Sequence, residues 1–125
     1  MEVFDGKLLI VAGLNNVLKA DRAPFMDQRR ESTQDIQKLF ELLESTLVDM
    51  VPNAQISFAV PLDVNYGLPP IAKEVYAKIS AEVIKRSHVE FDPNEPKRLR
   101  QFDFGGVHMI DSRSVEFWTK IIEKL

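Results

Sequence analysis

Two short apolar segments with a helical pattern between them constrain the fold of this chain more than any other feature. Residues 7–12 and 55–60 are strand-like runs, and over 32–50 apolar residues recur at three- and four-residue steps. A strand, a helix and a strand in this order favour parallel pairing through a right-handed crossover. The sequence therefore predicts an α/β fold.

The second half of the chain continues this alternation. Pro69 and Pro70 open a helical pattern that ends near Arg86, and residues 89–91 are a candidate third strand. The spacing of apolar residues over 112–124 predicts a last helix. We therefore expect a three-layer-like parallel sheet of about three strands with flanking helices.

Length and composition agree with one globular domain. The chain has 125 residues, of which 45% are hydrophobic and 28% charged, and it contains no cysteine. A chain of this size holds one core, so we expect a single domain over residues 1–125. The lack of cysteine excludes disulfides, a thiolate nucleophile and a cysteine-based zinc site. We expect no cofactor and no metal, because two histidines with scattered carboxylates make no recognisable metal site.

The charge balance disfavours general binding to nucleic acid. Lys and Arg number 16 against 19 Asp and Glu, which gives a net charge of −3, so nucleic-acid contact would need a local basic patch. The early apolar run is far shorter than the ~20 residues that span a bilayer. It follows Glu2 and Asp5 rather than a basic segment, unlike a secretory signal. We therefore expect no membrane association and a cytoplasmic or nuclear location.

Polar residues follow each of the first two predicted strands. Gly13, Asn15 and Asn16 form the turn expected after the first strand, and Asp63 and Asn65 lie in the loop after the second. Open α/β sheets bind ligands outside the carboxyl ends of their strands. We therefore expect these five residues to line one crevice.

A late histidine belongs to the same predicted crevice. The long loop 92–108 ends in Gly-Gly-Val-His, and His108 is the candidate general base of this half of the chain. An Asn amide beside Gly13 is suited to donate to an oxyanion. We expect Asn15 and His108 to meet at one rim of the sheet.

These blocks resemble those of the SGNH, or GDSL-type, hydrolase superfamily. In that family a strand ends in a G-x-N-D block whose Asn serves the oxyanion hole, and a late D-x-x-H block supplies the acid and base of a catalytic triad. Residues 13–16, Gly-Leu-Asn-Asn, are similar to the first block, with Asn15 at the oxyanion position. Gly-Gly-Val-His is similar to the late block, with His108 at the base position, and residues 49–61 are similar to the family's later helix end and strand. The resemblance covers nearly the whole chain as the later two thirds of the family fold, and it implies a partial flavodoxin-like, SGNH architecture.

The chain departs from the family pattern at the triad itself. The sequence contains no G-D-S block to supply the nucleophilic serine, and Gly105 stands where the family has the triad Asp. Asp103 lies five residues before His108 rather than three, and Asn16 replaces the Asp of the first block. Loss of any triad member removes most of the rate, because the three residues act as one unit.

We therefore interpret the chain as a non-catalytic SGNH-like binding or interaction module. Two alternatives stay open. In the first, the chain is a fragment or subunit of a serine ester hydrolase whose nucleophile lies outside it. In the second, it is a nucleic-acid-binding appendage of a mobile-element-like protein.

The second alternative depends on a basic cluster in the long loop. Lys97, Arg98 and Arg100 would contact an anion or a nucleic-acid backbone, and the rings of Phe102 and Phe104 would stack on bases. A solvated loop explains the same charges. Partner binding is a separate expectation: either a second copy or another chain pairs with an exposed sheet edge, or the helices and the loop cover it.

Overall fold

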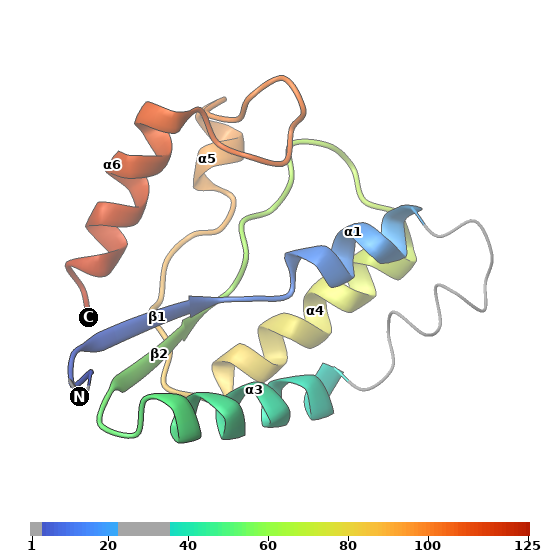
Figure 1. Ribbon diagram of the computed structural model, residues 1–125. Coiled ribbons are helices and arrows are strands. Elements are labelled where there is room, and N and C mark those ends of the chain that lie inside the picture. The colour runs from blue at the N-terminus through green and yellow to red at the C-terminus, as the bar shows by residue number, and fades with distance from the viewer. Residues whose placement is uncertain (1–3, 23–35) are drawn as a thin grey trace.

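Two parallel strands lie at the centre of the protein (Figure 1). The structure, a computed structural model, describes residues 4–22 and 36–125. Strand β1 (Lys7–Val11) pairs with β2 (Gln55–Ala59) along their full lengths. The α/β class and the parallel pairing predicted from the sequence are confirmed.

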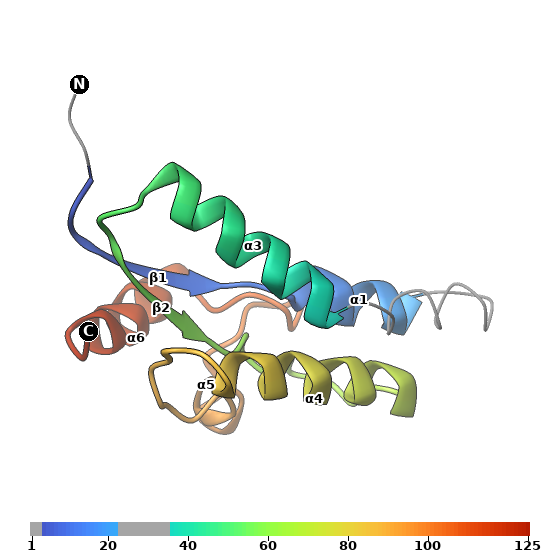
Figure 2. The same cartoon turned by 90° about the horizontal axis from the view of Figure 1, so that it is seen from below.

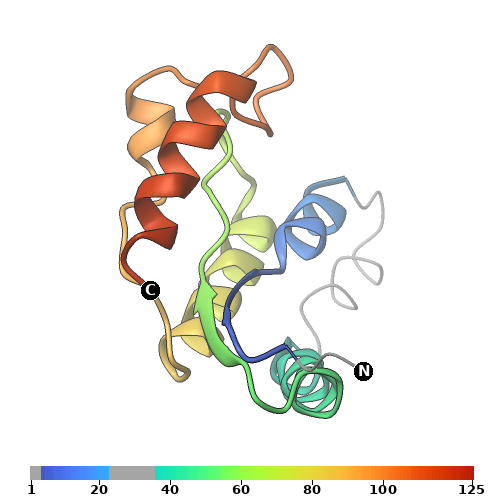
Figure 3. The same cartoon turned by 60° about the vertical axis from the view of Figure 1, so that its left-hand side comes forward.

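Helices flank both faces of this sheet. Figure 1 shows α6 on one side of the strands and α3 and α4 on the other. Figure 3 shows α6 and α1 on opposite sides of the strands, and Figure 2 shows α6 apart from α1, α3 and α4 in a view from below. The helices of the described residues are α1 (Leu14–Arg22), α3 (Ile36–Met50), α4 (Pro70–Ile84), α5 (Glu95–Arg98) and α6 (Asp111–Ile122).

Each face of the sheet has its own core. On one face, Ile10 and Ile56 pack against a buried cluster formed by Phe58 of β2 and by residues of α1, α3 and α4. The helical residues of this cluster are Val17, Ile36, Phe40, Ala72, Val75, Ile79 and Val83. On the other face, Leu9 packs against the smaller cluster of Met109, Phe117 and Ile121. Successive side chains of a strand point to opposite faces. Two short strands therefore hold two helical layers together.

Strand β1 is less buried than its continuous apolar sequence predicts. Leu8, Leu9 and Ile10 are only half-buried, and both end residues of the strand are exposed. Among the described residues β1 has β2 as its only strand neighbour, and an edge strand keeps one side open. Leu9 and Ile10 therefore pack on opposite faces of the sheet but are only partly covered.

A single parallel bridge stands in place of the predicted third strand at 89–91. The bridge pairs Phe58 with His88, through hydrogen bonds from Phe58 N to Ser87 O at 2.8 Å and from Val89 N to Phe58 O at 2.9 Å. Pro61 follows closely on β2 and has no N–H to donate, which limits how far a ladder can extend. The described sheet therefore has two strands.

A helix, α1, forms where the sequence predicts a polar turn at Asn15 and Asn16. Leu14 begins this helix, and Val17 and Leu18 are buried. These three positions have the i, i+3, i+4 spacing of an apolar helix face, which outweighs the turn preference of two Asn residues. Pro24 and the alternating charges over residues 21–30 predict a solvated connection there. Its first two residues belong to α1, and its residues from 23 on lie outside the described residues, as do residues 32–35 of the next predicted helix.

Two helices bury narrower or different faces than the apolar spacing predicts. Helical spacing places Leu39 and Met50 on the apolar face of the helix expected over 32–50, but both are exposed in α3. In α6, Val115 and Ile122 are exposed, and Phe117 occupies the core instead. A sheet of two strands covers only a narrow stripe of each helix, so part of a wide apolar face stays in solvent.

The long loop predicted over 92–108 contains short regular elements. The side chain of Asp92 accepts a 2.9 Å hydrogen bond from the backbone N–H of Asn94, an Asx turn that leads into α5. Further on, Phe102 and Met109 form an isolated antiparallel bridge. The loop is thereby folded into a short helix and a hairpin-like turn.

A cluster of charges joins α3 to the end of α4. Arg86 donates from Nε to Glu44 Oε1 at 2.6 Å and from Nη1 to Glu82 Oε1 at 3.1 Å, and its guanidinium lies 5.1 Å from the centroid of the Phe40 ring. The side chains of Arg86 and Glu82 are only 10% and 8% exposed. A hydrogen bond from Lys85 lowers the pKa of Glu82 against the opposing effect of burial, and Arg86 lowers it further. The cluster thus keeps a buried carboxylate ionised.

No helix within residues 4–22 and 36–125 is both long enough and apolar enough to cross a membrane.

Candidate functional site

A crevice of about 380 Å³ lies where the two strands end and the late loop returns. We call it the His108 crevice. Its walls come from the exit of β1, the segment after β2, the late loop and the first turns of α6, with the lining residues Val11, Leu14, Pro61, Leu62, Val107, His108, Met109, Asp111, Ser114 and Trp118. The carboxyl-end rim of the sheet and the His108 loop therefore share one concave surface.

A tight turn positions His108. Its backbone carbonyl accepts a 2.7 Å hydrogen bond from Asp103 N, and Gly106 N donates to Asp103 O at 3.1 Å. Gly106 has a φ of +73°, a conformation that side-chain-bearing residues rarely adopt, which explains glycine there. Asn65 N donates to Gly106 O at 2.8 Å and so fastens this turn to the loop after β2.

The crevice holds the three side-chain types of a hydrolytic triad without joining them. Asp111 and Ser114 lie in the first turns of α6 and share the crevice with His108. Within the described part of the chain, the ring of His108 makes no hydrogen bond to either side chain. A triad needs a base hydrogen-bonded to both the nucleophile and the orienting carboxylate. In this arrangement the three side chains therefore do not form a hydrogen-bonded triad.

The Asn residues after β1 lie beside the crevice rather than in it. Asn15 is exposed in the first turn of α1 and does not line the crevice, whereas Leu14 does. Asn16 N donates to Gly13 O at 3.0 Å, the first hydrogen bond of the helix. Gly13 has a φ of +108° and packs on Ile79 of α4. The local role of Gly13 is thus to turn the chain from β1 into α1.

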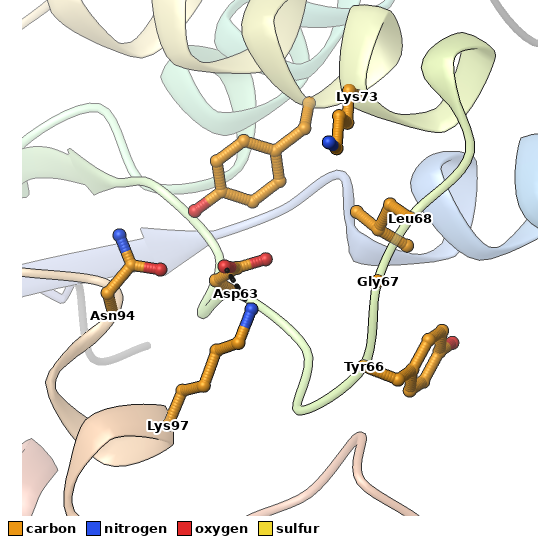
Figure 4. Close-up of a pocket in the computed structure, with 8 residues that line it drawn as sticks. Asp63, Tyr66, Gly67, Leu68, Lys73, Asn94 and Lys97 are labelled. Carbon is orange, nitrogen blue, oxygen red and sulfur yellow. Dashed lines mark hydrogen bonds and ion pairs between the residues drawn. The ribbon is translucent and has the colours of Figure 1, made fainter.

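A second, separate pocket of about 270 Å³ lies between the loop after β2, α4 and α5 (Figure 4). We call it the Lys73 pocket. It brings together charged and polar side chains from these three segments, and it is lined by Asp63, Tyr66, Gly67, Leu68, Lys73, Tyr76, Asn94 and Lys97. Of the predicted ligand residues, Asp63 and Lys97 meet here, although the sequence assigned them to different sites.

The pocket contains an ion pair and a buried phenol. Lys97 Nζ lies 3.3 Å from Asp63 Oδ2, and the two side chains are 38% and 24% exposed. The hydroxyl of Tyr76 donates a 2.6 Å hydrogen bond to the carbonyl of Pro61. Burial raises the pKa of Tyr76 above its ordinary value, and the nearby Asp63 carboxylate raises it further. Tyr76 is therefore a neutral wall of the pocket and a fixed donor to the end of β2.

The predicted basic cluster is divided by the fold. Lys97 faces Asp63, and Arg98 Nη1 lies 2.7 Å from Asp92 Oδ2. Arg100 is exposed on the surface with a φ of +53°. Of the two rings expected to stack on bases, Phe102 is buried and Phe104 is fully exposed. Among these residues, Arg100 is thus the one cation outside an ion pair, and Phe104 is the one exposed ring.

The sequence pattern does not reveal the Lys73 pocket. Helical spacing places Lys73 on the water-facing side of its helix, and Lys73 is exposed there while it also lines the pocket. No pattern in the sequence distinguishes Tyr76 or Asn94. The available signal was position: Lys73 follows Pro69 and Pro70, so it lies in the first turn of α4, next to the loop that leaves β2. Its place opposite Lys97 depends on how α5 folds back, which the sequence pattern does not encode.

No group of three or more His, Cys, Asp or Glu residues is arranged to hold a metal ion in the residues that the structure describes. Comparison with known protein families, with curated proteins and with solved structures gave no match.

Proposed function

We propose that this chain is a non-catalytic SGNH-like binding module whose ligand is a small acyl compound held in the His108 crevice. The supporting observation is that the exit of β1, the segment after β2 and the His108 loop line one crevice, the arrangement that the resemblance to the SGNH superfamily implies. Parallel strands with helices on both faces are compatible with a partial flavodoxin-like, SGNH architecture.

The lining of the crevice favours an acyl compound. Leu14, Leu62, Met109 and Trp118 supply apolar walls, which suit a short hydrocarbon chain. The imidazole of His108 offers a hydrogen bond to a carbonyl or hydroxyl oxygen. A few placed polar groups in an apolar pocket are typical of small-molecule sites.

The residues at the triad positions support binding without turnover. The sequence has no G-D-S block, and Gly105 carries no carboxylate to orient His108. An imidazole that is hydrogen-bonded to neither a serine nor a carboxylate supplies little of the rate of the complete unit.

Trp118 makes this proposal testable, because it is the only tryptophan in the sequence and it lines the crevice. Titration with ethyl butyrate should give a saturable change in tryptophan fluorescence, weakened in His108→Ala. His88→Ala is the matched control, since His88 lies outside the crevice. The rate of p-nitrophenyl butyrate hydrolysis should be the same for wild type and His108→Ala. A rate that is lost in His108→Ala would overturn the non-catalytic assignment, and an unchanged fluorescence spectrum would overturn the acyl ligand.

A second candidate function is ester hydrolysis with a serine of this chain. Ser114 and Asp111 line the same crevice as His108, so a hydroxyl, a carboxylate and an imidazole share one surface. A fluorophosphonate probe distinguishes the two functions. Labelling of wild type that disappears in Ser114→Ala would establish the hydrolase, and Ser112→Ala, two residues earlier on α6, is the control.

A further inference from the structure

We propose that the Lys73 pocket is a binding site for a small organic anion that carries a carboxylate or phosphate group. The site shares no lining residue with the His108 crevice. It is therefore independent of the proposed function, and each proposal stands or fails by its own experiment.

The first argument is charge. Two ammonium groups, those of Lys73 and Lys97, line the pocket against one carboxylate, that of Asp63. Asp63 is already neutralised by Lys97 at 3.3 Å. In the described part of the chain, Lys73 has neither an ion pair nor a hydrogen-bonding partner for its ammonium group. One positive charge in a concave site is thus left for a ligand.

The second argument is geometry. In Figure 4, Lys73 and Lys97 approach the pocket from opposite sides, from α4 and α5, with Asp63 between them. The contact with Asp63 uses one of the three N–H donors of Lys97. Charge-assisted hydrogen bonds to carboxylate or phosphate oxygens are about twice as strong as neutral ones. Lys73, together with the remaining donors of Lys97, is therefore suited to bind one anionic group in the pocket beside Asp63.

The third argument is the shape of the remaining wall. The Tyr76 ring and Leu68 add apolar surface to the lining, and the amide of Asn94 adds a neutral donor and acceptor. The phenol of Tyr76 is occupied by Pro61 O, so Tyr76 contributes its ring rather than its hydroxyl. The volume of about 270 Å³ is near the lower end for ligand pockets, which favours a small molecule. The expected ligand therefore has one anionic group and a small apolar body.

Replacing Asp63 should change the affinity for an anion in the opposite direction from replacing either lysine. The Asp63 carboxylate competes with the ligand for Lys97, because both need its ammonium group. Replacing Asp63 by Asn keeps the size of the side chain and removes the competing charge. Asp63→Asn should therefore bind an anion more tightly than wild type, whereas Lys73→Met and Lys97→Met should bind it more weakly.

The experiment is a titration followed by the ¹⁵N–¹H amide shifts of residues lining the pocket, at low ionic strength. The probes are inorganic phosphate, acetate and benzoate. Wild type should show saturable shifts at Lys73, Asn94 and Lys97, with affinity about tenfold weaker in Lys73→Met and severalfold tighter in Asp63→Asn. Lys78→Met is the matched control, because Lys78 lies on the same helix outside the pocket.

Comparison of the three probes distinguishes a phosphorylated ligand from a carboxylate. Stronger shifts with phosphate indicate a phosphorylated ligand, and stronger shifts with acetate or benzoate indicate a carboxylate. His108→Ala should leave this titration unchanged, whatever it does to acyl binding. Equal affinity in Lys73→Met and Lys78→Met would overturn the proposal, as would the lack of saturable shifts with all three probes.

Discussion

Gly13 lies directly against Ile79. A Cβ atom built on Gly13 would be 2.7 Å from Ile79 Cδ1, closer than real side chains approach one another, and Gly13 has a φ of +108°. The same residue therefore satisfies two demands: a backbone conformation that side chains disfavour and close packing of the start of α1 on α4. Because Ile79 is fully buried in the larger core, this contact ties the exit of β1 to the centre of the molecule.

Gly13→Ala should lower the free energy of unfolding by about 2–4 kcal/mol, from backbone strain and overpacking together. Urea unfolding followed by circular dichroism measures this change. Gly67→Ala is the control, because nothing lies within 4 Å of a Cβ at that position, and its midpoint should stay close to that of wild type. Equal midpoints for the two variants would show that Gly13 is not under this constraint.

Arg86→Met should lower the free energy of unfolding by about 1–3 kcal/mol, because it leaves a buried carboxylate with fewer partners. Glu82 would keep its 2.8 Å contact with Lys85 but lose the hydrogen bond from Arg86. The control is Lys120→Met, which removes an exposed pair with Glu116 at 3.6 Å and should change stability by less than about 1 kcal/mol. Thermal unfolding of both variants tests the difference, and an Arg86→Met protein as stable as Lys120→Met would contradict it.

The lowered pKa of Glu82 should make the free energy of unfolding depend on pH in the acid range. The hydrogen bond from Lys85 lowers the pKa of Glu82 in the folded protein below its ordinary value of 4.5. The stabilisation is therefore complete above pH 4.5 and is lost as the pH falls through the lower, folded-state pKa. Glu82→Gln should be less stable than wild type at neutral pH and should lose less stability on acidification.

Urea unfolding at a series of pH values measures this effect. Glu74→Gln, on the exposed side of the same helix, is the control and should keep the pH profile of wild type. A Glu82→Gln profile parallel to that of wild type through the acid range would refute the assignment.

Phe117→Ala should destabilise the protein by about 3–5 kcal/mol, because Phe117 is buried and its removal leaves a cavity. Phe117 also contacts the rings of Phe91 and Trp118, at centroid distances of 5.8 and 5.2 Å. Val115→Ala should change stability by less than about 0.5 kcal/mol, since Val115 is 69% exposed. If Val115→Ala were the more damaging change, the buried face of α6 would include Val115 rather than Phe117.

The sequence predicted where in the chain the His108 loop lies, but not which residues line the crevice around it. The position of His108 on a loop just before the last helix follows from the Gly-Gly turn and the apolar spacing after it, and the structure has both. Asn15 was expected in the same crevice, yet Leu14 lines it, because α1 begins one residue earlier than a turn at Asn15 would allow. The pairing of Asp63 with Lys97 joins residues 34 positions apart, a distance at which local patterns carry no information.

The sequence by itself determined several of the strands and helices, but not α1, α5 or the reduction of the third strand to a single bridge. Apolar periodicity, proline and glycine act over a few residues, so they predicted β1, β2, α4 and α6 and the parallel order of the two strands. Only the tertiary structure decided which face of each helix is buried, that the sheet has two strands, and that Lys73 and Lys97 share a pocket. Those features depend on how much area a small sheet can cover and on contacts between distant segments, which are properties of the packed molecule rather than of any stretch of its chain.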